Sequence, residues 1–138
     1  MNFGNVLVVF ALEAESQGRF ADFNLLISGV GKVNAAYHLT RKLAEWGHQK
    51  KGLPKLVLNL GTAGSTQFKA GSIVNCTRFI QRDIDATALG FELHATPYDN
   101  TPVSLANGAR YGLYPEGICG TGDIFSTTGA TATISPPS

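Results

Sequence analysis

The chain is short and almost neutral. It has 138 residues, of which 43% are hydrophobic and 15% charged, which is enough apolar material for one folded core and excludes a disordered chain. Eleven Lys and Arg residues against ten Asp and Glu residues give a formal charge of +1. Such a balance excludes a protein that binds nucleic acid or an anionic membrane through its overall charge, so any partner is recognised locally.

The first predicted element is a strand at residues 6–12, "VLVVFAL". A continuous run of aliphatic and β-branched residues is typical of a strand that is covered on both faces in an α/β protein. The run has no basic segment before it, is too short to cross a membrane and passes directly into carboxylates. We therefore expect a cytoplasmic protein without a membrane partner.

A strand, a helix and another strand follow. "NLLISGVG" predicts the strand, apolar residues at helical spacing from Lys32 predict the helix, and Gly47 is a plausible stop for it. After a basic connection, "LVLNLG" at residues 56–61 predicts the next buried strand. A strand, helix and strand at this spacing form a right-handed crossover, so we expect parallel strand pairs.

The rest of the chain predicts two more strands, "GSIVNCTRFI" and "GICGTGDIF". Residues 1–125 show no internal repeat and read as one domain, and residues 126–138 read as a flexible tail that is rich in Thr, Ser and Pro. Cys76 and Cys119 lie far apart without metal-ligand spacing, which favours reduced, buried thiols over a zinc site or a disulfide framework.

Candidate functional residues follow the predicted strands, because ligands collect beyond the carboxyl ends of strands in open α/β sheets. Glu13 and Glu15 follow the first strand. They complement a helix dipole in one interpretation, and in the other one of them acts as a general base at the rim of a pocket.

Two glycine turns follow later strands. "SGVGKVNAA" lacks the third glycine of a dinucleotide fingerprint, where Asn34 stands, and it lacks the glycine and the hydroxyl of a P-loop, where Leu26 and Val33 stand. In one interpretation the free amides of this turn, and of the turn at "GTAGS", face a polar ligand; in the other, which is the commoner case, each is a plain tight turn.

A metal site is not expected. Asp83, Asp85 and His94 share one segment, but no third close ligand has convincing spacing, so turn or cap carboxylates are favoured. His38 and His48 fall in or just after the predicted helix, where structural roles are favoured.

Taken in order, "FALEAE", "SGVGKVNAA", "LNLGTAGS", "RDIDATALGF" and "GTGDIF" resemble the nucleoside phosphorylase and nucleosidase superfamily. The nearest likeness is to the 5′-methylthioadenosine/S-adenosylhomocysteine nucleosidases and related bacterial nucleosidases. The resemblance implies an α/β fold, a three-layer sandwich around a mixed β-sheet. It also implies hydrolysis of the N-glycosidic bond of a purine nucleoside without a metal or organic cofactor.

The resemblance assigns the catalytic and ribose-facing roles as follows. Glu15 matches the glutamate that positions and activates water, and Glu13 matches a less directly involved position of the same motif. Val30 matches an apolar residue that lines the region of the ribose and its 5′-substituent.

The purine-facing roles lie further along the chain. Thr62, Ala63 and Gly64 match a turn near the purine and ribose, Phe125 matches the aromatic residue that stacks on the base, and Ser126 falls where backbone groups address the base edge.

The resemblance also implies a partner. Ala86, Leu89 and Phe91 match a segment that reaches toward the partner's active site in dimeric nucleosidases, so we expect a homodimer. The chain lacks an evident arginine set for a phosphate co-substrate, which favours water over phosphate as the nucleophile.

Two departures from the family pattern change the expected activity. The segment between Glu15 and Ser28 is shorter than in the best-known nucleosidases, which predicts a different substrate rim. After "GDIF" the family continues into a "VEME"-like ribose-binding motif and a general-acid aspartate, and residues 126–138 contain neither.

We therefore expect a C-terminally truncated chain with impaired hydrolysis. The alternatives are a non-catalytic module that binds purine nucleosides or pairs with a paralogue, a nucleoside phosphorylase, and a folded fragment without a ligand.

Overall fold

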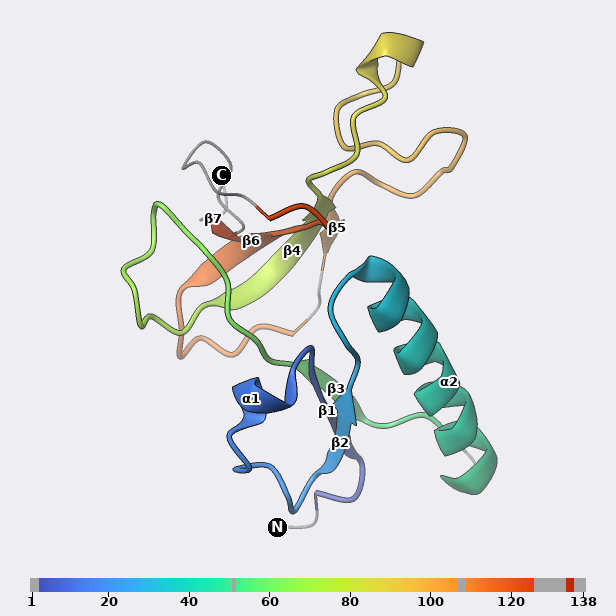
Figure 1. Cartoon of the computed structure of the whole chain (residues 1–138), viewed down its shortest axis with the longest axis vertical. Coiled ribbons are helices and arrows are strands. Elements are labelled where there is room, and N and C mark those ends of the chain that lie inside the picture. Colours follow the sequence, from blue (N-terminus) through green and yellow to red (C-terminus); the bar gives the residue numbers. More distant parts are fainter. Residues whose placement is uncertain (1–2, 51, 107–108, 126–133, 136–138) are drawn as a thin grey trace. The chain divides into compact units, whose positions relative to one another are not determined.

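The computed structural model describes residues 3–50, 52–106, 109–125 and 134–135. The chain folds into two compact units, Met1–Thr62 and Ala63–Ser138. The elements of the first unit, labelled in Figure 1, are β1 (Val6–Phe10), α1 (Glu13–Ser16), β2 (Asn24–Ile27), α2 (Lys32–Lys50) and β3 (Leu56–Asn59).

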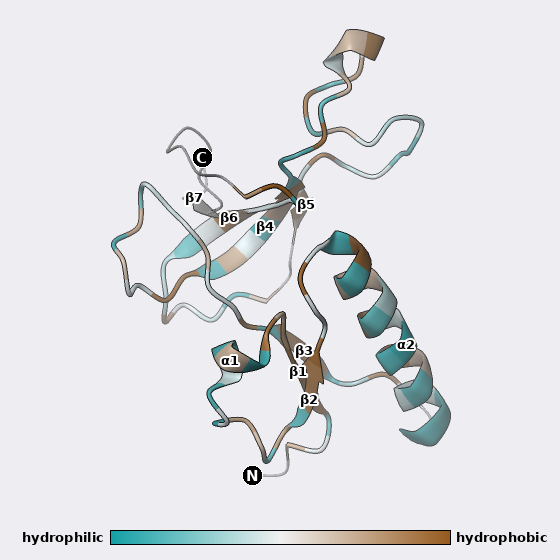
Figure 2. Ribbon diagram, in the orientation of Figure 1, coloured by the Kyte–Doolittle hydropathy of each residue, from teal (hydrophilic) through white to brown (hydrophobic). Residues whose placement is uncertain are grey.

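The first unit is built on a parallel sheet of three strands in the order β2-β1-β3. Val8 of the central strand pairs with Leu25 on one side and with Leu58 on the other. The continuous apolar run predicted this environment correctly, because every residue from Leu7 to Phe10 is buried. Figure 2 shows the apolar strands of this sheet in brown.

The two faces of β1 are covered by different partners. Leu7 and Val9 pack against Trp46 of α2, and Leu26, Leu39 and Leu43 surround that cluster. The opposite side is aromatic, since the Phe10 ring lies 5.2 Å from the Phe20 ring. Leu7 and Val8 are fully buried, and burial of each such side chain stabilises the fold by about 1.5–3 kcal/mol.

Helix α2 is longer than predicted. Gly47 does not end it, and the helix continues to Lys50. The last turn is held by Lys50, whose ammonium group lies 4.2 Å from the Trp46 ring centroid and donates a hydrogen bond of 2.8 Å to the Gly4 carbonyl. These contacts outweigh the low helix propensity of a single glycine.

The second unit contains β4 (Asn75–Gln81), the short 3₁₀ helix η1 (Thr87–Leu89), β5 (Leu105–Ala106), β6 (Glu116–Thr121) and β7 (Ile134–Ser135). Its sheet has the order β5-β4-β6-β7. The central pair β4 and β6 is parallel, and β5 and β7 run antiparallel to their neighbours. The sheet is therefore mixed, as the family resemblance implied.

Two local predictions for this unit were wrong. The strand predicted from Gly71 begins only at Asn75, because Gly71 has a φ of +84° and the Ser72 amide closes a turn onto the Lys69 carbonyl. Strand β7 was not predicted, yet Ile134 pairs with Cys119. A β-branched residue beside an open strand edge forms a bridge that local composition does not reveal. The remainder of the predicted tail lies outside the described residues.

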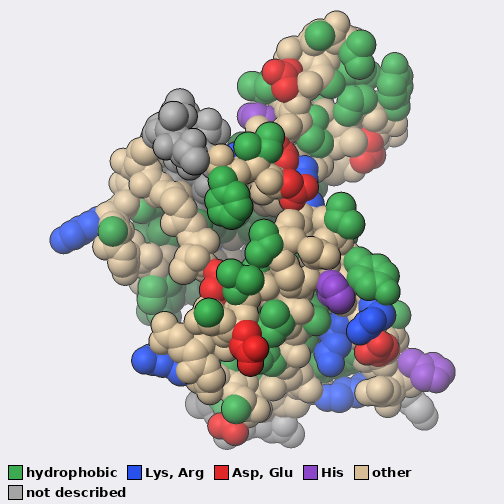
Figure 3. Space-filling view, in the orientation of Figure 1, with side chains coloured by type: hydrophobic (Ala, Val, Ile, Leu, Met, Phe, Trp, Pro, Cys, Tyr) green, Lys and Arg blue, Asp and Glu red, His purple; other side chains and the backbone are tan. Residues whose placement is uncertain are grey.

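The described helices give no candidate for a membrane span, since none combines the necessary length with sufficient hydropathy. The face in Figure 3 carries both acidic and basic side chains, as the small net charge implies.

Candidate active site

The candidate site of the first unit lies at the carboxyl ends of its parallel strands. Just beyond β2, the amides of Ser28 and Gly29 donate to the carbonyls of Phe10 and Ala11 at 2.8 and 3.1 Å. Beyond β3, the Leu60 amide donates to Val9 at 2.9 Å. The residues that follow all three strands are therefore anchored at one edge of the sheet, as predicted for an α/β ligand site.

Glu15 and Thr62 are in direct contact at this edge. The Thr62 amide and hydroxyl both donate to Glu15 Oε1, at 3.1 and 3.0 Å. The other carboxylate oxygen, Oε2, accepts the Leu12 amide at 3.1 Å. The two residues are 47 positions apart in the sequence, and the parallel pairing of β1 with β3 brings them together.

These hydrogen bonds keep Glu15 ionised. Partial burial by itself raises the pKa of Glu15, but hydrogen bonds from the Thr62 backbone, the Leu12 backbone, the Thr62 hydroxyl and the Ala11 backbone bring the pKa below its ordinary value. The side chain is consequently a carboxylate at neutral pH, suited to accepting a hydrogen bond from a polar ligand or a water molecule.

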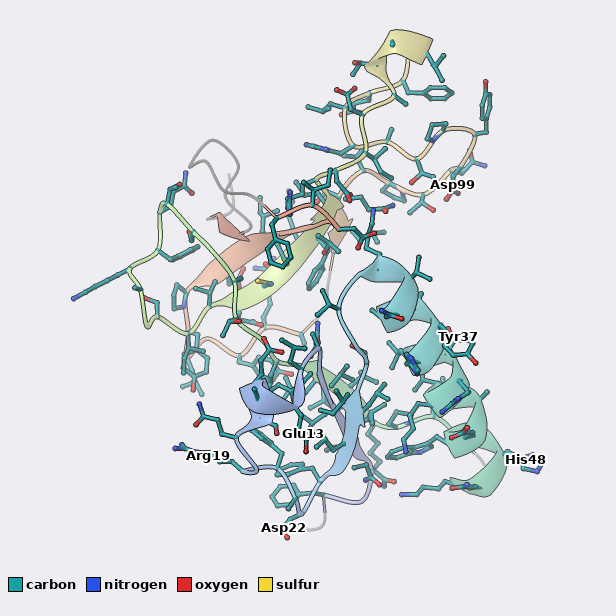
Figure 4. The ribbon with its side chains drawn as sticks, in the orientation of Figure 1. Glu13, Arg19, Asp22, Tyr37, His48 and Asp99 are labelled. Atoms are coloured by element: carbon teal, nitrogen blue, oxygen red, sulfur yellow. The ribbon has the colours of Figure 1, made fainter. Side chains whose placement is uncertain are left out.

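The two glutamates of α1 have different surroundings. Glu13 is exposed and is labelled in Figure 4. Glu15 caps the helix through the Leu12 amide in addition to its contact with Thr62. Glu15 therefore makes a local contact at the start of the helix and a second contact with the residue Thr62, which follows β3.

Val30 lies in a glycine turn with positive φ angles at Gly29 and Gly31, 79° and 97°. The side chain of Val30 is 52% exposed, so it is available to a ligand. The Asn34 side chain donates to the Val30 carbonyl at 2.7 Å. The sequence analysis considered Asn34 only as the residue that stands where a dinucleotide fingerprint has its third glycine. In the structure, its side chain holds this turn.

The second unit begins at Ala63, and both Ala63 and Gly64 are exposed. Nothing lies within 4 Å of a Cβ placed on Gly64, so this turn has open space beside it. A side chain at that position would meet no neighbour.

Phe125 is 85% exposed and follows β6 through a turn that the residues directly after β4 hold in place. The Asp83 carboxylate accepts the Asp123 amide at 2.8 Å, and the Arg82 guanidinium donates to the Ile124 carbonyl. A Cβ on Gly122 would lie 3.0 Å from Asp83 Cγ, so only glycine fits there without a shift.

Arg82 and Asp83 are positioning residues that sequence reasoning missed, since it weighed Asp83 only as a metal ligand or cap. The signal that was available is the pair of motifs "RD" and "GD", which lie near the ends of the last two predicted strands. Ser126, the expected neighbour of Phe125 at the base edge, lies outside the described residues.

The segment expected to reach a partner forms a compact loop around η1. The amides of Leu89 and Phe91 donate to the Ala86 carbonyl at 3.0 and 3.4 Å. Leu89 is 72% exposed, and the Phe91 ring packs edge-on against Tyr98 at 5.1 Å. The loop therefore presents apolar side chains to the outside.

The acidic residues near this loop have local roles. Asp85 accepts hydrogen bonds from the Thr87 hydroxyl and amide, which together with the nearby His94 hold the pKa of Asp85 below its ordinary value. Within the described residues, Asp83, Asp85 and His94 form no group that could hold a metal ion. On α2, His38 packs edge-on against Tyr37, and His48 is exposed (Figure 4).

Fold and site together define an α/β protein with polar residues at the carboxyl ends of its strands. The sequence model described as "Phosphorylase superfamily" matches residues 19–132. The chain belongs to the phosphorylase superfamily, as the sequence motifs indicated.

Curated relatives carry a more specific name. The chain is 32% identical over 123 residues to a 5′-methylthioadenosine/S-adenosylhomocysteine nucleosidase of a Marinomonas species, covering 78% of this chain and 51% of that protein. It is 36% identical over 84 residues to the protein of the same name from Staphylococcus carnosus, covering 59% of this chain and 33% of that protein. The chain thus spans about half the length, or less, of these relatives.

Solved structures share the fold. The Helicobacter pylori nucleosidase named MTAN has a TM-score of 0.71 at 18% identity, over 94% of this chain and 76% of that one. The Campylobacter jejuni 5′-methylthioadenosine/S-adenosylhomocysteine nucleosidase has a TM-score of 0.67 at 21% identity, over 89% and 66%. The Neisseria meningitidis nucleosidase, solved with methylthio-immucillin-A, has a TM-score of 0.62 at 26% identity, over 87% and 65%. The α/β fold class expected from the sequence is confirmed.

Proposed function

We propose that this chain belongs to a purine nucleoside N-ribosyl hydrolase of the methylthioadenosine/S-adenosylhomocysteine type, and that Glu15 orients the attacking water. The observation that carries the proposal is the Glu15 carboxylate, held at the strand ends by the Thr62 amide and hydroxyl. The names of the curated relatives supply the substrate class.

The charge state of Glu15 suits this reaction. Cleavage of an N-glycosidic bond builds positive charge on the ribose, and a carboxylate near that charge stabilises it. A carboxylate with a lowered pKa is a weak base, so its contribution is to fix the water by hydrogen bonding and to take the proton only after the C–O bond has largely formed.

The remaining roles come from the family resemblance, and the exposure of the side chains supports them. We assign Val30 to the ribose and its 5′-substituent, the turn from Thr62 through Ala63 to Gly64 to the nucleoside, and Phe125 to stacking on the purine. Val30 and Phe125 are both largely exposed, which supports a role in ligand contact. Ser126 remains the candidate for the base edge, and no metal or organic cofactor enters the proposal.

The test is adenine release from methylthioadenosine by the purified 138-residue chain and by Glu15→Gln, followed by absorbance. Release by the chain that is lost in Glu15→Gln supports a hydrolase. Calorimetry with the same nucleoside then separates the alternatives. Binding without release favours a non-catalytic binding module. A chain that does not bind the nucleoside and does not release adenine overturns the proposal.

The same assay decides between water and phosphate as the nucleophile. A hydrolase releases free ribose at a rate independent of added phosphate. A nucleoside phosphorylase, the other activity that the family name allows, needs phosphate and releases the sugar phosphate. Phosphate-dependent release would therefore replace the hydrolase with the phosphorylase.

We also propose a cytoplasmic homodimer in which the segment with Ala86, Leu89 and Phe91 contacts the partner. The exposure of Leu89 and of Tyr98, which is 93% exposed, supports an apolar contact there. Light scattering on the purified chain tests the dimer, and Leu89→Asp should shift it to the monomer. A monomeric wild-type chain would contradict this part.

A further inference from the structure

The two cysteines of the chain lie on neighbouring strands of the second unit. Cys76 belongs to β4 and Cys119 to β6, and these strands are parallel. Cys76 pairs in register with Gly117, and Cys119 is two positions further along β6. Because side chains on a strand alternate, both cysteines lie on the same face of the sheet.

A β-bulge reinforces this placement. The register shifts between Cys76 and Arg78, so that Phe79, three positions after Cys76, pairs with Cys119. The bulge places Cys76 and Phe79 on one face of the sheet, although they are three positions apart, and it bends β4 locally. Gly117, opposite Cys76, has no side chain that could separate the two thiols.

The two thiols influence each other and differ in acidity. The hydrogen bond from Cys76 lowers the pKa of Cys119 to about 7 against the effect of burial, helped by the Thr121 hydroxyl and the charge of Arg82. The same contact raises the pKa of Cys76. Both side chains are only half-buried, in contrast to the buried thiols predicted from the sequence, so a small reagent reaches them.

We propose that Cys76 and Cys119 form a redox-active pair, in which Cys119 is the nucleophile toward peroxide and Cys76 the resolving thiol. The two cysteines lie on neighbouring strands and on one face of the sheet, which places their side chains near each other. This site is independent of Glu15 and of the proposed hydrolysis.

The chemistry balances with a peroxide as the oxidant. The Cys119 thiolate attacks one oxygen of hydrogen peroxide, the O–O bond breaks, and the departing hydroxide takes up a proton as water, which leaves a sulfenic acid on Cys119. The Cys76 sulfur then attacks the Cys119 sulfur, the S–S bond forms and the S–O bond breaks. The second hydroxide leaves as water with the thiol proton, so the thiols lose two electrons and the peroxide gains two.

Peptide mapping of the full chain after treatment with about one equivalent of peroxide tests the pair. Trypsin cleavage after Lys69 and Arg78 releases Cys76 in one peptide, and cleavage after Arg110 releases Cys119 in another. We expect the main oxidised product to be these two peptides joined by a disulfide within one chain. Disulfides between chains, seen as dimers on a non-reducing gel, would overturn the proposal. A peptide map in which the Cys76 and Cys119 peptides are not joined by a disulfide would overturn it as well.

Two matched variants test the assignment of roles. In Cys76→Ser, peroxide should leave a sulfenic acid on Cys119 that dimedone traps, whereas in Cys119→Ser the remaining Cys76 should stay reduced at the same dose. Equal oxidation of the two variants, or faster oxidation of Cys76, would overturn the assignment. Circular dichroism checks that both variants are folded.

A measurement on the wild-type chain does not depend on the variants. Near neutral pH, iodoacetamide should alkylate Cys119 at least about tenfold faster than Cys76, because the thiolate is the reactive form. In denaturant the two rates should become similar. Equal rates in the folded chain would contradict the assignment.

Discussion

The carboxylate of Glu15 accepts hydrogen bonds from two segments that are distant in the sequence. Thr62 donates twice to Oε1, and Leu12 donates once to Oε2. These donors bind the ionised form, so they lower the pKa of Glu15 and stabilise the folded chain while the carboxylate is charged.

The lowered pKa of Glu15 predicts a pH-dependent contribution to stability. A depressed pKa gives a contribution that is complete above the unfolded value of 4.5 and is lost as the pH falls through the lower folded value. The free energy of unfolding of wild type minus that of Glu15→Gln should therefore shrink on acidification. Urea unfolding at neutral pH and in steps to about pH 3 measures this difference. A difference that stays constant or grows would contradict the role of the hydrogen bonds.

Thr62 supplies the second prediction at this scale. Thr62→Val removes the hydroxyl donor but keeps the shape and the amide, so it should raise the pKa of Glu15 and cost about 0.5–1.5 kcal/mol of stability. Thr62→Ser is the matched control, because it retains the hydroxyl, and it should resemble wild type. Carboxyl titration by NMR and denaturant unfolding measure the two effects. Identical Glu15 titrations in all three proteins would show that the contact with the hydroxyl is not formed in solution.

Helix α2 offers a prediction at the scale of one element. Gly47 lies inside the helix with open space where a Cβ would stand. Gly47→Ala should therefore stabilise the chain by about 0.5–1 kcal/mol, because glycine loses more backbone freedom on folding. Gly29→Ala is the opposing control, since Gly29 has a φ of +79° and should lose stability. Thermal unfolding of both variants checks the signs, and a destabilised Gly47→Ala would mean that the helix ends there after all.

Gly122, in the turn after β6, should respond to substitution by alanine in the opposite way from Gly47. In Gly122→Ala the new methyl group would lie 3.0 Å from Asp83 Cγ and 3.2 Å from Arg82 Cζ, so the two side chains that hold the turn before Phe125 must move. We expect a loss of about 1–3 kcal/mol, as for overpacked positions elsewhere. Gly64→Ala, with nothing within 4 Å, serves as the control for stability and should change little. Equal unfolding midpoints for the two variants would argue against a tight turn.

Local sequence patterns predicted which helices and strands form better than they predicted the residues at which these elements end. The apolar run of β1 and the helical spacing from Lys32 were sufficient, because each element buries residues that are close in sequence. The end of α2 depends on Trp46 and Lys50, and the bridge to Ile134 depends on a distant strand edge. Such endings are set by tertiary contacts that no short window contains.

The candidate site was predictable only where family motifs marked it. Glu15, Thr62 and Phe125 stand in quoted motifs, but the hydrogen bond between Asp83 and the Asp123 amide joins residues 40 positions apart. The contact of Cys76 with Cys119 further depends on a bulge, which moves the side chains of one strand relative to its neighbour. Spacing along the chain cannot reveal a register of this kind.

At the scale of the whole molecule, each of the two compact units carries residues to which we assign a role in the proposed reaction. Glu15, Val30 and Thr62 belong to Met1–Thr62, and Phe125 belongs to Ala63–Ser138. The part of the chain that matches the Marinomonas nucleosidase is 78% of this chain and covers 51% of that relative. Water orientation and base stacking have proposed candidates here, whereas the general-acid aspartate and the ribose-binding glutamate that the family resemblance implies have no match in these 138 residues.

The lack of a match for the general acid predicts how fast the 138-residue chain by itself cleaves a nucleoside. Without a group that protonates the leaving purine, adenine release from methylthioadenosine should be about 10²–10⁴-fold slower than for the Marinomonas nucleosidase assayed alongside. Glu15→Gln should lower the remaining rate further, because orienting water and protonating the base are separate tasks. A rate for the wild-type chain equal to that of the relative would mean that another residue among these 138 supplies the proton. The pH profile of that rate would then identify the acid, since activity would fall as the pH rises through its pKa.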